Sequence, residues 1–256
     1  MRCRSIMKNI LALIPARGGS TRVLNKNIRL LGGIPLLAYT VRAAMESIVN
    51  RVIVSTNDTE IANVAKSYGA EVPFLRPDHL STPRATSVSA IHHALEWLKT
   101  NEGYVPEIVA FLPPTNPFRP AQSITDCIIK LQTNRVQSAV TIEEVIHHPF
   151  LLMKEGPDGL LHDLGLNKEN ILRTQDRPVF WYPSPACYVN NYSFFSSDLC
   201  RETGYCYNHK ECLGVKITRL EAFDIDTEED FEIAQLYIKH YFQEIRHNVK
   251  GSSFIS

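Results

Sequence analysis

A turn near the start of the chain carries three cations and follows directly on a short apolar run. The run 10–14 has no helical period and ends at a proline, as a buried strand does before a turn. Arg17, Arg22 and Lys26 stand in a segment that also holds two glycines. Glycine lets backbone N–H groups approach a phosphate closely, and the cations add the positive charge that a polyphosphate needs. The pattern predicts a nucleoside triphosphate site, although the turn lacks both the P-loop spacing and the Gly-x-Gly-x-x-Gly spacing. The alternative is an ordinary strand-to-helix turn with solvated cations.

Two carboxylates near the other end of the chain form the second candidate group. Asp224 and Asp226 alternate with Ile225, and alternate side chains of an extended segment point the same way. Two hard oxygen donors beside a triphosphate suit Mg²⁺, which binds carboxylates together with phosphates and water. The alternative is that these residues only cap the helix that follows. We expect both groups to meet at one magnesium-bound triphosphate. The predicted catalytic residues are Arg17, Lys26, Asp224 and Asp226.

Strands and helices must alternate to position these groups, and the first half of the chain shows that pattern. Apolar residues recur at helical spacing in several stretches, and short apolar or β-branched runs stand between them. The alternation predicts an α/β fold with a doubly wound, mostly parallel sheet. The expected strands are 10–14, 51–55, 71–75, 108–112 and 138–142. The expected helices are 35–48, one capped by Asn57 or Asp58 that runs through Ala65, one that opens at Thr82, and 120–131.

The alternation stops in the segment 146–185, which is rich in Pro, Gly, His and aromatic residues. The segment is too long for a simple loop in a compact domain, so we expect an inserted subdomain. A strand at 186–190 and a last helix after the capping box Thr227-x-x-Asp230 should follow. The predicted organisation is an α/β domain of residues 8–145 and 186–246, the insertion 146–185 and a disordered tail 247–256.

Composition excludes several classes of function. The chain has 256 residues, 44% of them hydrophobic, which suffices for one large α/β domain or two small ones. Its formal net charge is +0 and its basic residues are spread along the chain, so we expect no nucleic-acid partner. No run approaches the ~18 apolar residues of a membrane helix, so we expect no membrane association.

The first residues and the cysteines bear on the cellular compartment. The basic and then apolar start imitates a signal peptide, but its apolar part is too short. Six cysteines in a chain of this size are expected to be reduced thiols, which predicts a cytoplasmic protein. A zinc site at Cys206-x-x-His209-x-x-Cys212 is disfavoured, because the spacing is not that of paired Cys-x-x-Cys knuckles.

The cationic turn resembles the signature of a known enzyme family. The acylneuraminate cytidylyltransferases, which make CMP-sialic acids, carry Ala-Arg-x-x-Ser-Lys-Gly-x-x-x-Lys-Asn after their first strand. Ala16-Arg17-Gly18-Gly19-Ser20 and Lys26-Asn27 match this signature. The run Ser20-Thr21-Arg22 looks more like the related 3-deoxy-manno-octulosonate cytidylyltransferases.

Other stretches between about residues 9 and 241 extend the resemblance. Leu75-Arg76-Pro77 matches the family's Leu-Arg-Pro, and Thr86 takes the place of its nucleotide-contacting Ser. The run Leu112-Pro113-Pro114-Thr115-Asn116-Pro117-Phe118-Arg119 resembles Leu-Gln-Pro-Thr-Ser-Pro-Leu-Arg. Asp-Ile-Asp at 224–226 stands where the family keeps its metal aspartates.

The resemblance implies a Rossmann-like nucleotidyltransferase that uses CTP and Mg²⁺. It implies transfer of CMP to the anomeric hydroxyl of a 3-deoxy-2-ulosonic acid with release of pyrophosphate, in a homodimer whose inserted segment covers the partner's sugar pocket. The implied nucleotide-binding residues are Ala16, Arg17, Gly18, Ser20, Arg22, Lys26, Asn27, Arg76 and Thr86. The implied substrate-binding residues are Pro113, Thr115, Gln175 and Ser184.

Most departures from the family pattern are on the sugar side, and one is on the phosphate side. Pro113 replaces a glutamine that bonds the sugar, and Pro has no side-chain donor or acceptor. Ser184-Pro185-Ala186 replaces Asn-Gly-Ala, and Thr21 replaces a phosphate-binding lysine. The pattern predicts an acid other than plain N-acetylneuraminate. The alternatives are an octulosonate cytidylyltransferase and a nucleotide-binding protein that has lost catalysis.

Overall fold

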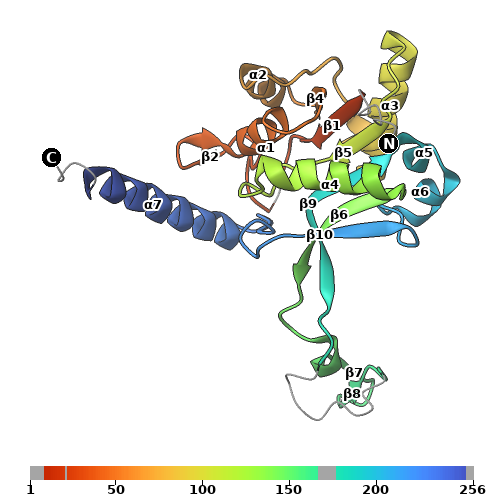
Figure 1. Ribbon diagram of the computed structural model, residues 1–256, viewed down its shortest axis with the longest axis vertical. Coiled ribbons are helices and arrows are strands. Elements are labelled where there is room, and N and C mark those ends of the chain that lie inside the picture. Colours follow the sequence, from red (N-terminus) through yellow and green to blue (C-terminus); the bar gives the residue numbers. More distant parts are fainter. Residues whose placement is uncertain (1–8, 21, 167–176, 252–256) are drawn as a thin grey trace, which may run out of the picture.

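The centre of the molecule is a six-stranded sheet (Figure 1). The computed structural model describes residues 9–20, 22–166 and 177–251, as backbone only from 241 onward. The strands of the sheet are β1 (Ile10–Pro15), β4 (Arg51–Ser55), β5 (Ile108–Phe111), β6 (Ser138–Glu144), β9 (Trp181–Asn191) and β10 (Cys212–Lys216). Their order is β10-β6-β9-β5-β1-β4, and β9 alone runs antiparallel to its neighbours β5 and β6. The predicted α/β class and mostly parallel, doubly wound sheet are confirmed.

Helices cover both faces of this sheet, as the continuous apolar strands require. Because side chains alternate along a strand, Ile10, Ala12 and Ile14 of β1 enter one core while Leu11 and Leu13 enter the other. One face is covered by α1 (Leu36–Met45), α2 (Thr59–Ser67) and α4 (Ala121–Asn134). The other face is covered by α3 (Ser87–Glu102), α5 (Tyr192–Phe195) and α6 (Asp198–Thr203).

Polar caps set where the helices next to the predicted site begin. Asp58 accepts the N–H groups of Glu60 and Ile61 at the start of α2, which confirms one of the two predicted caps. The capping box before the last helix, α7 (Glu228–Gly251), is also confirmed. There the Asp230 N–H donates to Thr227 Oγ1 at 3.2 Å and the Thr227 N–H donates to Asp230 Oδ2 at 2.8 Å.

Three predicted elements differ from the structure by more than their ends. Residues 71–75 form only isolated bridges at Glu71 and Leu75, because Pro73 between them has no N–H to donate to a ladder. The helix predicted from Thr82 begins at Ser87, since the Thr86 hydroxyl caps it there. The strand predicted at 186–190 is the longer antiparallel β9, whose direction no sequence period encodes.

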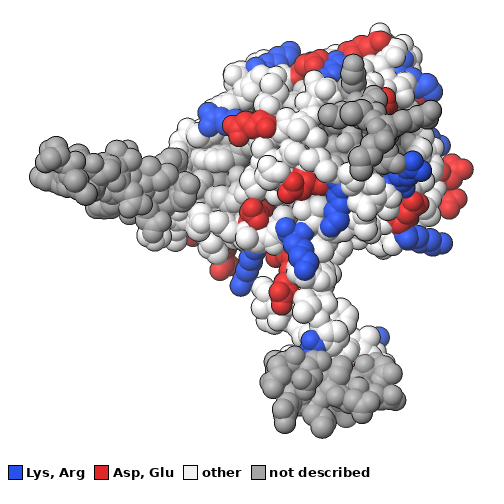
Figure 2. Space-filling view, viewed as in Figure 1, with Lys and Arg blue, Asp and Glu red and all other residues white. Residues whose placement is uncertain are grey.

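An arm extends from the body in the segment predicted as an insertion (Figure 1). The β6–β9 ladder continues as far as the pair Glu144 and Trp181, and a hairpin of β7 (Met153–Glu155) and β8 (Leu161–Asp163) lies beyond it. Figure 2 shows acidic and basic side chains interspersed over the visible face of the body. The remaining short elements are β2 (Leu30–Leu31), β3 (Ile34–Pro35) and the 3₁₀ turns η1 (Asp78–Leu80) and η2 (Pro149–Leu151).

The first turns of α7 pack beside the segment that follows β1. Phe231, Ala234 and Ile238 share a third apolar cluster with Val23 and Leu31, which fixes the C-terminal segment next to the turn after β1. The helix runs to Gly251, into the segment predicted as a disordered tail, and residues 252–256 lie outside the described part. Within the described residues, no helix is both long and apolar enough to span a membrane.

Candidate functional site

A cleft of about 320 Å³ opens where β1 and β5 end. In open α/β sheets this edge, at the carboxyl ends of the strands, is where ligands bind. Of the residues proposed from sequence, those that line it are Arg17, Ser20, Arg22, Lys26, Asn27, Arg76, Thr86, Pro113, Thr115 and Asp226.

The turn after β1 is held from both sides by backbone and amide hydrogen bonds. The Gly18 N–H donates to Asn57 Oδ1 at 2.9 Å, and Asn27 Nδ2 donates to the Arg17 carbonyl at 2.9 Å. A Cβ atom added to Gly18 would lie 2.8 Å from Asp58 Oδ2, so the residue must be glycine for the turn to sit this close to α2. Asn27 is 5% exposed and its Oδ1 has no partner among the described residues, so it can accept from a ligand.

One end of the cleft joins the cationic turn to the C-terminal carboxylates. Lys26 Nζ donates to the Ile225 carbonyl at 2.7 Å and lies 3.4 Å from Asp226 Oδ1, and Arg22 Nη1 lies 3.5 Å from Asp226 Oδ2. Two segments about 200 residues apart in sequence therefore meet at one site, as the sequence predicts.

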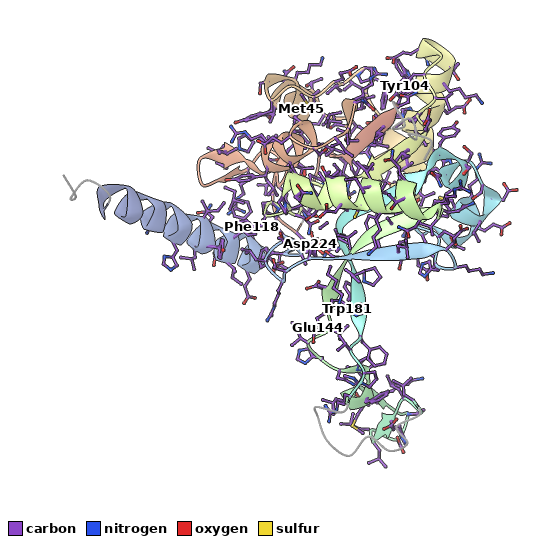
Figure 3. All side chains as sticks on the ribbon, in the orientation of Figure 1. Met45, Tyr104, Phe118, Glu144, Trp181 and Asp224 are labelled. Atoms are coloured by element: carbon purple, nitrogen blue, oxygen red, sulfur yellow. The ribbon has the colours of Figure 1, made fainter. Side chains whose placement is uncertain are left out.

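Asp224 lies beside the first turn of α7 (Figure 3) and is partly buried, whereas Asp226 is exposed. Burial raises the pKa of its carboxyl group, and a hydrogen bond from the Thr115 side chain offsets part of that rise. Its Oδ1 is buried and has no partner among the described residues. A carboxylate kept this dry with a free oxygen is suited to a cation, although Asp224 itself is not part of the cleft lining.

The other end of the cleft holds two cations without a carboxylate. Arg76 is 5% exposed, its Nη2 donates to the Ser55 carbonyl at 3.2 Å, and its Nε has no partner in the described chain. Burial, and then repulsion from Arg17, lowers the pKa of Arg76 to about 10. Arg17 Nη1 makes a weak bond to the Ser81 carbonyl at 3.4 Å. Within the described residues neither arginine forms an ion pair, so both can bind acceptors of a ligand.

Thr86 stands on the rim of the same end. Its hydroxyl accepts the Ser89 N–H at 3.1 Å and so caps α3, while the side chain also lines the cleft. The hydroxyl hydrogen is still available to a ligand.

The remaining predicted residues lie off the cleft or beyond the described chain. Ala16 is buried and Gly18 faces α2, so their contribution is the backbone of the turn. Ser184 is fully buried in β9, where its hydroxyl accepts the Ala186 N–H at 3.3 Å, and this placement gives no support to its role as a substrate contact. Gln175 and Thr21 lie outside the described residues.

Two side chains that the sequence reasoning passed over organise the turn after β5. Asn116 is 1% exposed, and its Nδ2 donates to the carbonyls of Phe223 and Ala222. Arg119 is 3% exposed, and its guanidinium donates to the Pro113 carbonyl at 3.3 Å, to the Ala186 carbonyl and to Thr40. The available signal was the presence of polar residues in a proline-rich turn directly after a buried strand.

A row of aromatic rings leads away from the floor of the cleft. Phe111 lines the cleft, its ring centroid is 6.2 Å from that of Tyr188, and Tyr188 stacks on Tyr207 at 5.9 Å. Tyr207 in turn stacks on His209 at 4.4 Å. Sequence patterns did not single out these rings, because their contacts join strands and loops that are distant in the chain.

Comparisons with known proteins agree with this geometry. A cytidylyltransferase family model matches residues 11–157. The chain is 31% identical over 229 residues to an N-acylneuraminate cytidylyltransferase of Escherichia coli, a match that covers 88% of this chain and 51% of that protein. It is 31% identical over 237 residues to a pseudaminic acid cytidylyltransferase of Campylobacter jejuni, covering 91% of this chain and 97% of the relative. It is 30% identical over 194 residues to a CMP-N,N'-diacetyllegionaminic acid synthase of Legionella pneumophila, covering 73% of this chain and 83% of the relative. The chain thus spans about half the length of the E. coli relative and nearly all of the C. jejuni one.

Solved structures share the fold. A CMP:2-keto-3-deoxy-manno-octonic acid synthetase complexed with CTP superposes with a TM-score of 0.66 at 11% identity, covering 91% of this chain and 99% of that one. A 4-diphosphocytidyl-2C-methyl-D-erythritol synthase from Anaerococcus prevotii gives a TM-score of 0.61 at 15% identity, covering 91% and 96%. At these identities the likeness shows a common nucleotidyltransferase fold.

Proposed function

Because this chain belongs to the cytidylyltransferase family, we propose that it transfers the cytidylyl group of CTP to the anomeric hydroxyl of a nonulosonic acid and releases pyrophosphate. The observation that carries the proposal is the meeting of the cationic turn and the C-terminal carboxylates, with Lys26 Nζ 3.4 Å from Asp226 Oδ1. The relatives named above act on sialic, pseudaminic and legionaminic acids, which are all acids of this class.

The two ends of the cleft suit the two ends of CTP. Within the described residues, Arg76 Nε–H and Asn27 Oδ1 have no partner, so the pair offers a donor and an acceptor to the edge of a cytosine ring. Thr86 lines this end as well. Arg17 stands next to Arg76, and Lys26 and Arg22 continue the row of cations toward Asp226, which suits a triphosphate.

We propose Mg²⁺ as the cofactor, held by Asp224 and Asp226 together with phosphate oxygens. The residues fit, because Asp224 Oδ1 is buried and has no partner in the described part of the chain, and both ligands are hard carboxylate oxygens. Within the described residues no group of three or more His, Cys, Asp or Glu is placed to hold a metal ion, and phosphate oxygens and water would supply the remaining ligands. When bound, Mg²⁺ would neutralise the charge that develops on the phosphate oxygens.

In the proposed reaction the anomeric oxygen forms a bond to the α-phosphorus while the bond from that phosphorus to the β-phosphate oxygen breaks. The proton of the anomeric hydroxyl passes to a base that is not yet identified. Lys26 and Arg17 hold the triphosphate in line and stabilise the charge on departing pyrophosphate, so these residues act by positioning and by electrostatics.

The sugar side supports an acid with apolar substituents. Pro113 and Thr115 line the cleft floor, and Pro113 offers no side-chain hydrogen bond. Phe111 and Pro114 line the same part of the cleft and add apolar atoms beside those of Pro113, against which methyl or N-acyl groups can pack. We therefore propose a pseudaminic- or legionaminic-like acid as the substrate.

We further propose a homodimer formed through the arm and a cytoplasmic location. Large apolar side chains of the arm, such as Leu151, Met153, Leu160 and Leu161, are more than half exposed, and a second copy of the chain would cover them. Sedimentation velocity would show a dimer, and a monomer at micromolar concentration would contradict it.

The cysteines that the structure describes, Cys127 among them, are free thiols, which supports a cytoplasmic location.

Pyrophosphate release tests the proposed function. The protein is incubated with CTP, Mg²⁺ and one acid at a time: pseudaminic, legionaminic, N-acetylneuraminic or 3-deoxy-manno-octulosonic acid. We expect fastest release with pseudaminic or legionaminic acid and recovery of the CMP-sugar. Release with the octulosonic acid alone would overturn the proposed sugar class. CTP binding by calorimetry without release for any acid would favour a binding protein that has lost catalysis.

A further inference from the structure

Asn116 connects the turn after β5 to the segment that carries Asp224. Its Nδ2 donates to the Phe223 carbonyl at 3.1 Å and to the Ala222 carbonyl at 3.3 Å. These two residues directly precede Asp224. At this position the sequence departs from the Pro-Thr-Ser-Pro that it otherwise resembles, because asparagine stands where serine is expected.

The same turn also holds the residue that follows Asp224. The Ile225 N–H donates to the Thr115 carbonyl at 2.9 Å, and the Thr115 side chain bonds the Asp224 carboxylate itself. The segment 223–226 belongs to neither a helix nor a strand. With no ladder to fix it, the position of the carboxylate depends on these side-chain and backbone bonds.

The turn itself is firmly anchored on its far side. The Arg119 guanidinium bonds the Pro113 carbonyl within the turn, the Ala186 carbonyl of β9 and Thr40 of α1, so the turn is tied to two other elements. Asn116 is almost fully buried, and its Oδ1 has no partner in the described chain. The two bonds that its amide donates are therefore its contribution, and the side chain does not line the cleft.

We propose that Asn116 is a positioning residue that sets the Asp224 carboxylate for the metal ion. The inference rests on the proposed function in taking Asp224 as a metal ligand. Groups that orient metal ligands without touching the metal change metal affinity by ~10–100-fold when they are removed.

The test compares Mn²⁺ binding to the CTP complexes of four variants. Asn116→Leu keeps the branched shape in a larger side chain and removes both N–H donors, whereas Asn116→Ser keeps one hydroxyl donor. Asn190→Leu is the control for the loss of a buried amide, because Asn190 on β9 is equally buried and bonds residues other than those next to Asp224. It donates to the Cys206 carbonyl at 2.9 Å and accepts from Ser138 Oγ at 2.6 Å. Asp224→Asn gives the value for a lost ligand. Water-proton relaxation separates protein-bound Mn²⁺ from Mn²⁺ on free CTP.

We expect Asn116→Leu to weaken Mn²⁺ binding by at least ~10-fold, with Asn116→Ser between it and wild type. Calorimetric affinity for CTP without metal should stay unchanged, and Asn190→Leu should lower the melting temperature without changing Mn²⁺ affinity. Equal Mn²⁺ affinities for wild type and Asn116→Leu, whatever their melting temperatures, would overturn the inference and leave the proposed function standing.

A failure of the proposed function gives a different result. If wild type binds Mn²⁺ through Asp224 but releases no pyrophosphate with any acid, the proposed catalysis is wrong. The Mn²⁺ affinities of the Asn116 variants still decide the inference in that case. If Asp224→Asn binds Mn²⁺ as wild type does, Asp224 is not a ligand and the inference is overturned.

Discussion

The cations at the two ends of the cleft differ in whether they have a carboxylate partner. At one end Arg76 is 5% exposed next to Arg17, and neither makes an ion pair in the part of the chain described here. At the other end Lys26 and Arg22 both lie within 3.5 Å of Asp226. The first end can take a ligand's acceptors without displacing a carboxylate. The second must exchange partners, because phosphates that take Lys26 and Arg22 release the carboxylate.

This difference explains how one cleft can bind a nucleotide and control its metal. A carboxylate that is paired with two cations has a lower affinity for a metal ion until those cations find another anion. We therefore expect Asp226 to become a metal ligand only when a triphosphate is present. Metal binding and nucleotide binding would then be coupled. The coupling would lie at the paired end, the end of the cleft where Lys26 and Arg22 pair with Asp226.

Breaking the paired end should have the largest effect. Asp226→Asn removes a proposed metal ligand, so turnover should fall by about 1,000-fold, or ~4 kcal/mol of transition-state stabilisation. Calorimetry in EDTA should show tighter CTP binding than wild type, because Lys26 and Arg22 are freed and a like charge is removed. Near-normal pyrophosphate release would contradict the assignment of Asp226.

Removing a cation from the unpaired end, the end that holds Arg76 and Arg17, should lower the affinity for CTP without destabilising the fold. Arg76→Met removes a charged donor to the nucleotide, and such bonds contribute ~1.5–3 kcal/mol, which predicts a ~10-fold or greater loss of CTP affinity. The melting temperature should not fall, because a buried cation without a carboxylate disfavours the folded state. The readouts are calorimetry and thermal unfolding.

Arg51→Met is the matched control for that prediction. Arg51 bonds Glu71 at 2.6 Å and Glu102 at 2.6 Å and does not line the cleft. Its loss should lower the melting temperature and leave CTP affinity unchanged. If both arginine variants lost stability alike, the contrast between paired and unpaired cations would be wrong.

A smaller effect is expected from shifting the turn between the two ends. In Gly18→Ala the new Cβ would lie 2.8 Å from Asp58 Oδ2, so the turn or the cap of α2 must move. A displacement well under ~1 Å should reduce turnover by ~10-fold, and the rate at saturating CTP measures it. The double variant with Asp58→Gly removes both close atoms, Asp58 Oδ2 and the Asp58 Cβ at 3.1 Å, and glycine is tolerated as a helix cap. Recovery of turnover in it would show that the clash is the cause, and no recovery would exclude it.

The smallest effect belongs to the rim of the unpaired end. Thr86→Ala removes the cap of α3, which should cost ~1 kcal/mol and lower the melting temperature by ~2–4 °C. Thr86→Ser should retain the cap. A CTP affinity reduced as strongly as in Arg76→Met would mean that the hydroxyl contacts the base more closely than its capping bond implies.

The sequence predicts the paired end better than the unpaired one. The cationic turn and the Asp224–Asp226 alternation are local patterns, and a local pattern is enough to indicate which atoms would share a triphosphate. That Arg76 is buried without a carboxylate depends on what packs over it, which no spacing in the chain encodes. The resemblance to the family located Arg76, but only the structure shows its environment.

The fold shows the same contrast between features that depend on neighbouring residues and features that depend on distant segments of the chain. Strand and helix periods predict the α/β class and most elements of the body, and Asp58 and the Thr227–Asp230 box are where local capping chemistry places them. The direction of β9 and the bonds of Asn116 were not predictable, because they depend on chain segments dozens of residues away or more. Ser184 shows the converse, because the motif predicts a substrate contact at a position that the strand buries completely.

A crystal structure of the protein with CTP and Mg²⁺ tests the central claim most directly. The account predicts cytosine on Arg76, the triphosphate on Arg17 and Lys26, and the metal on Asp224 and Asp226, with the Lys26–Asp226 pair replaced by phosphate contacts. A nucleotide bound elsewhere, or a metal-bound triphosphate that leaves Lys26 and Arg22 on Asp226, would contradict it.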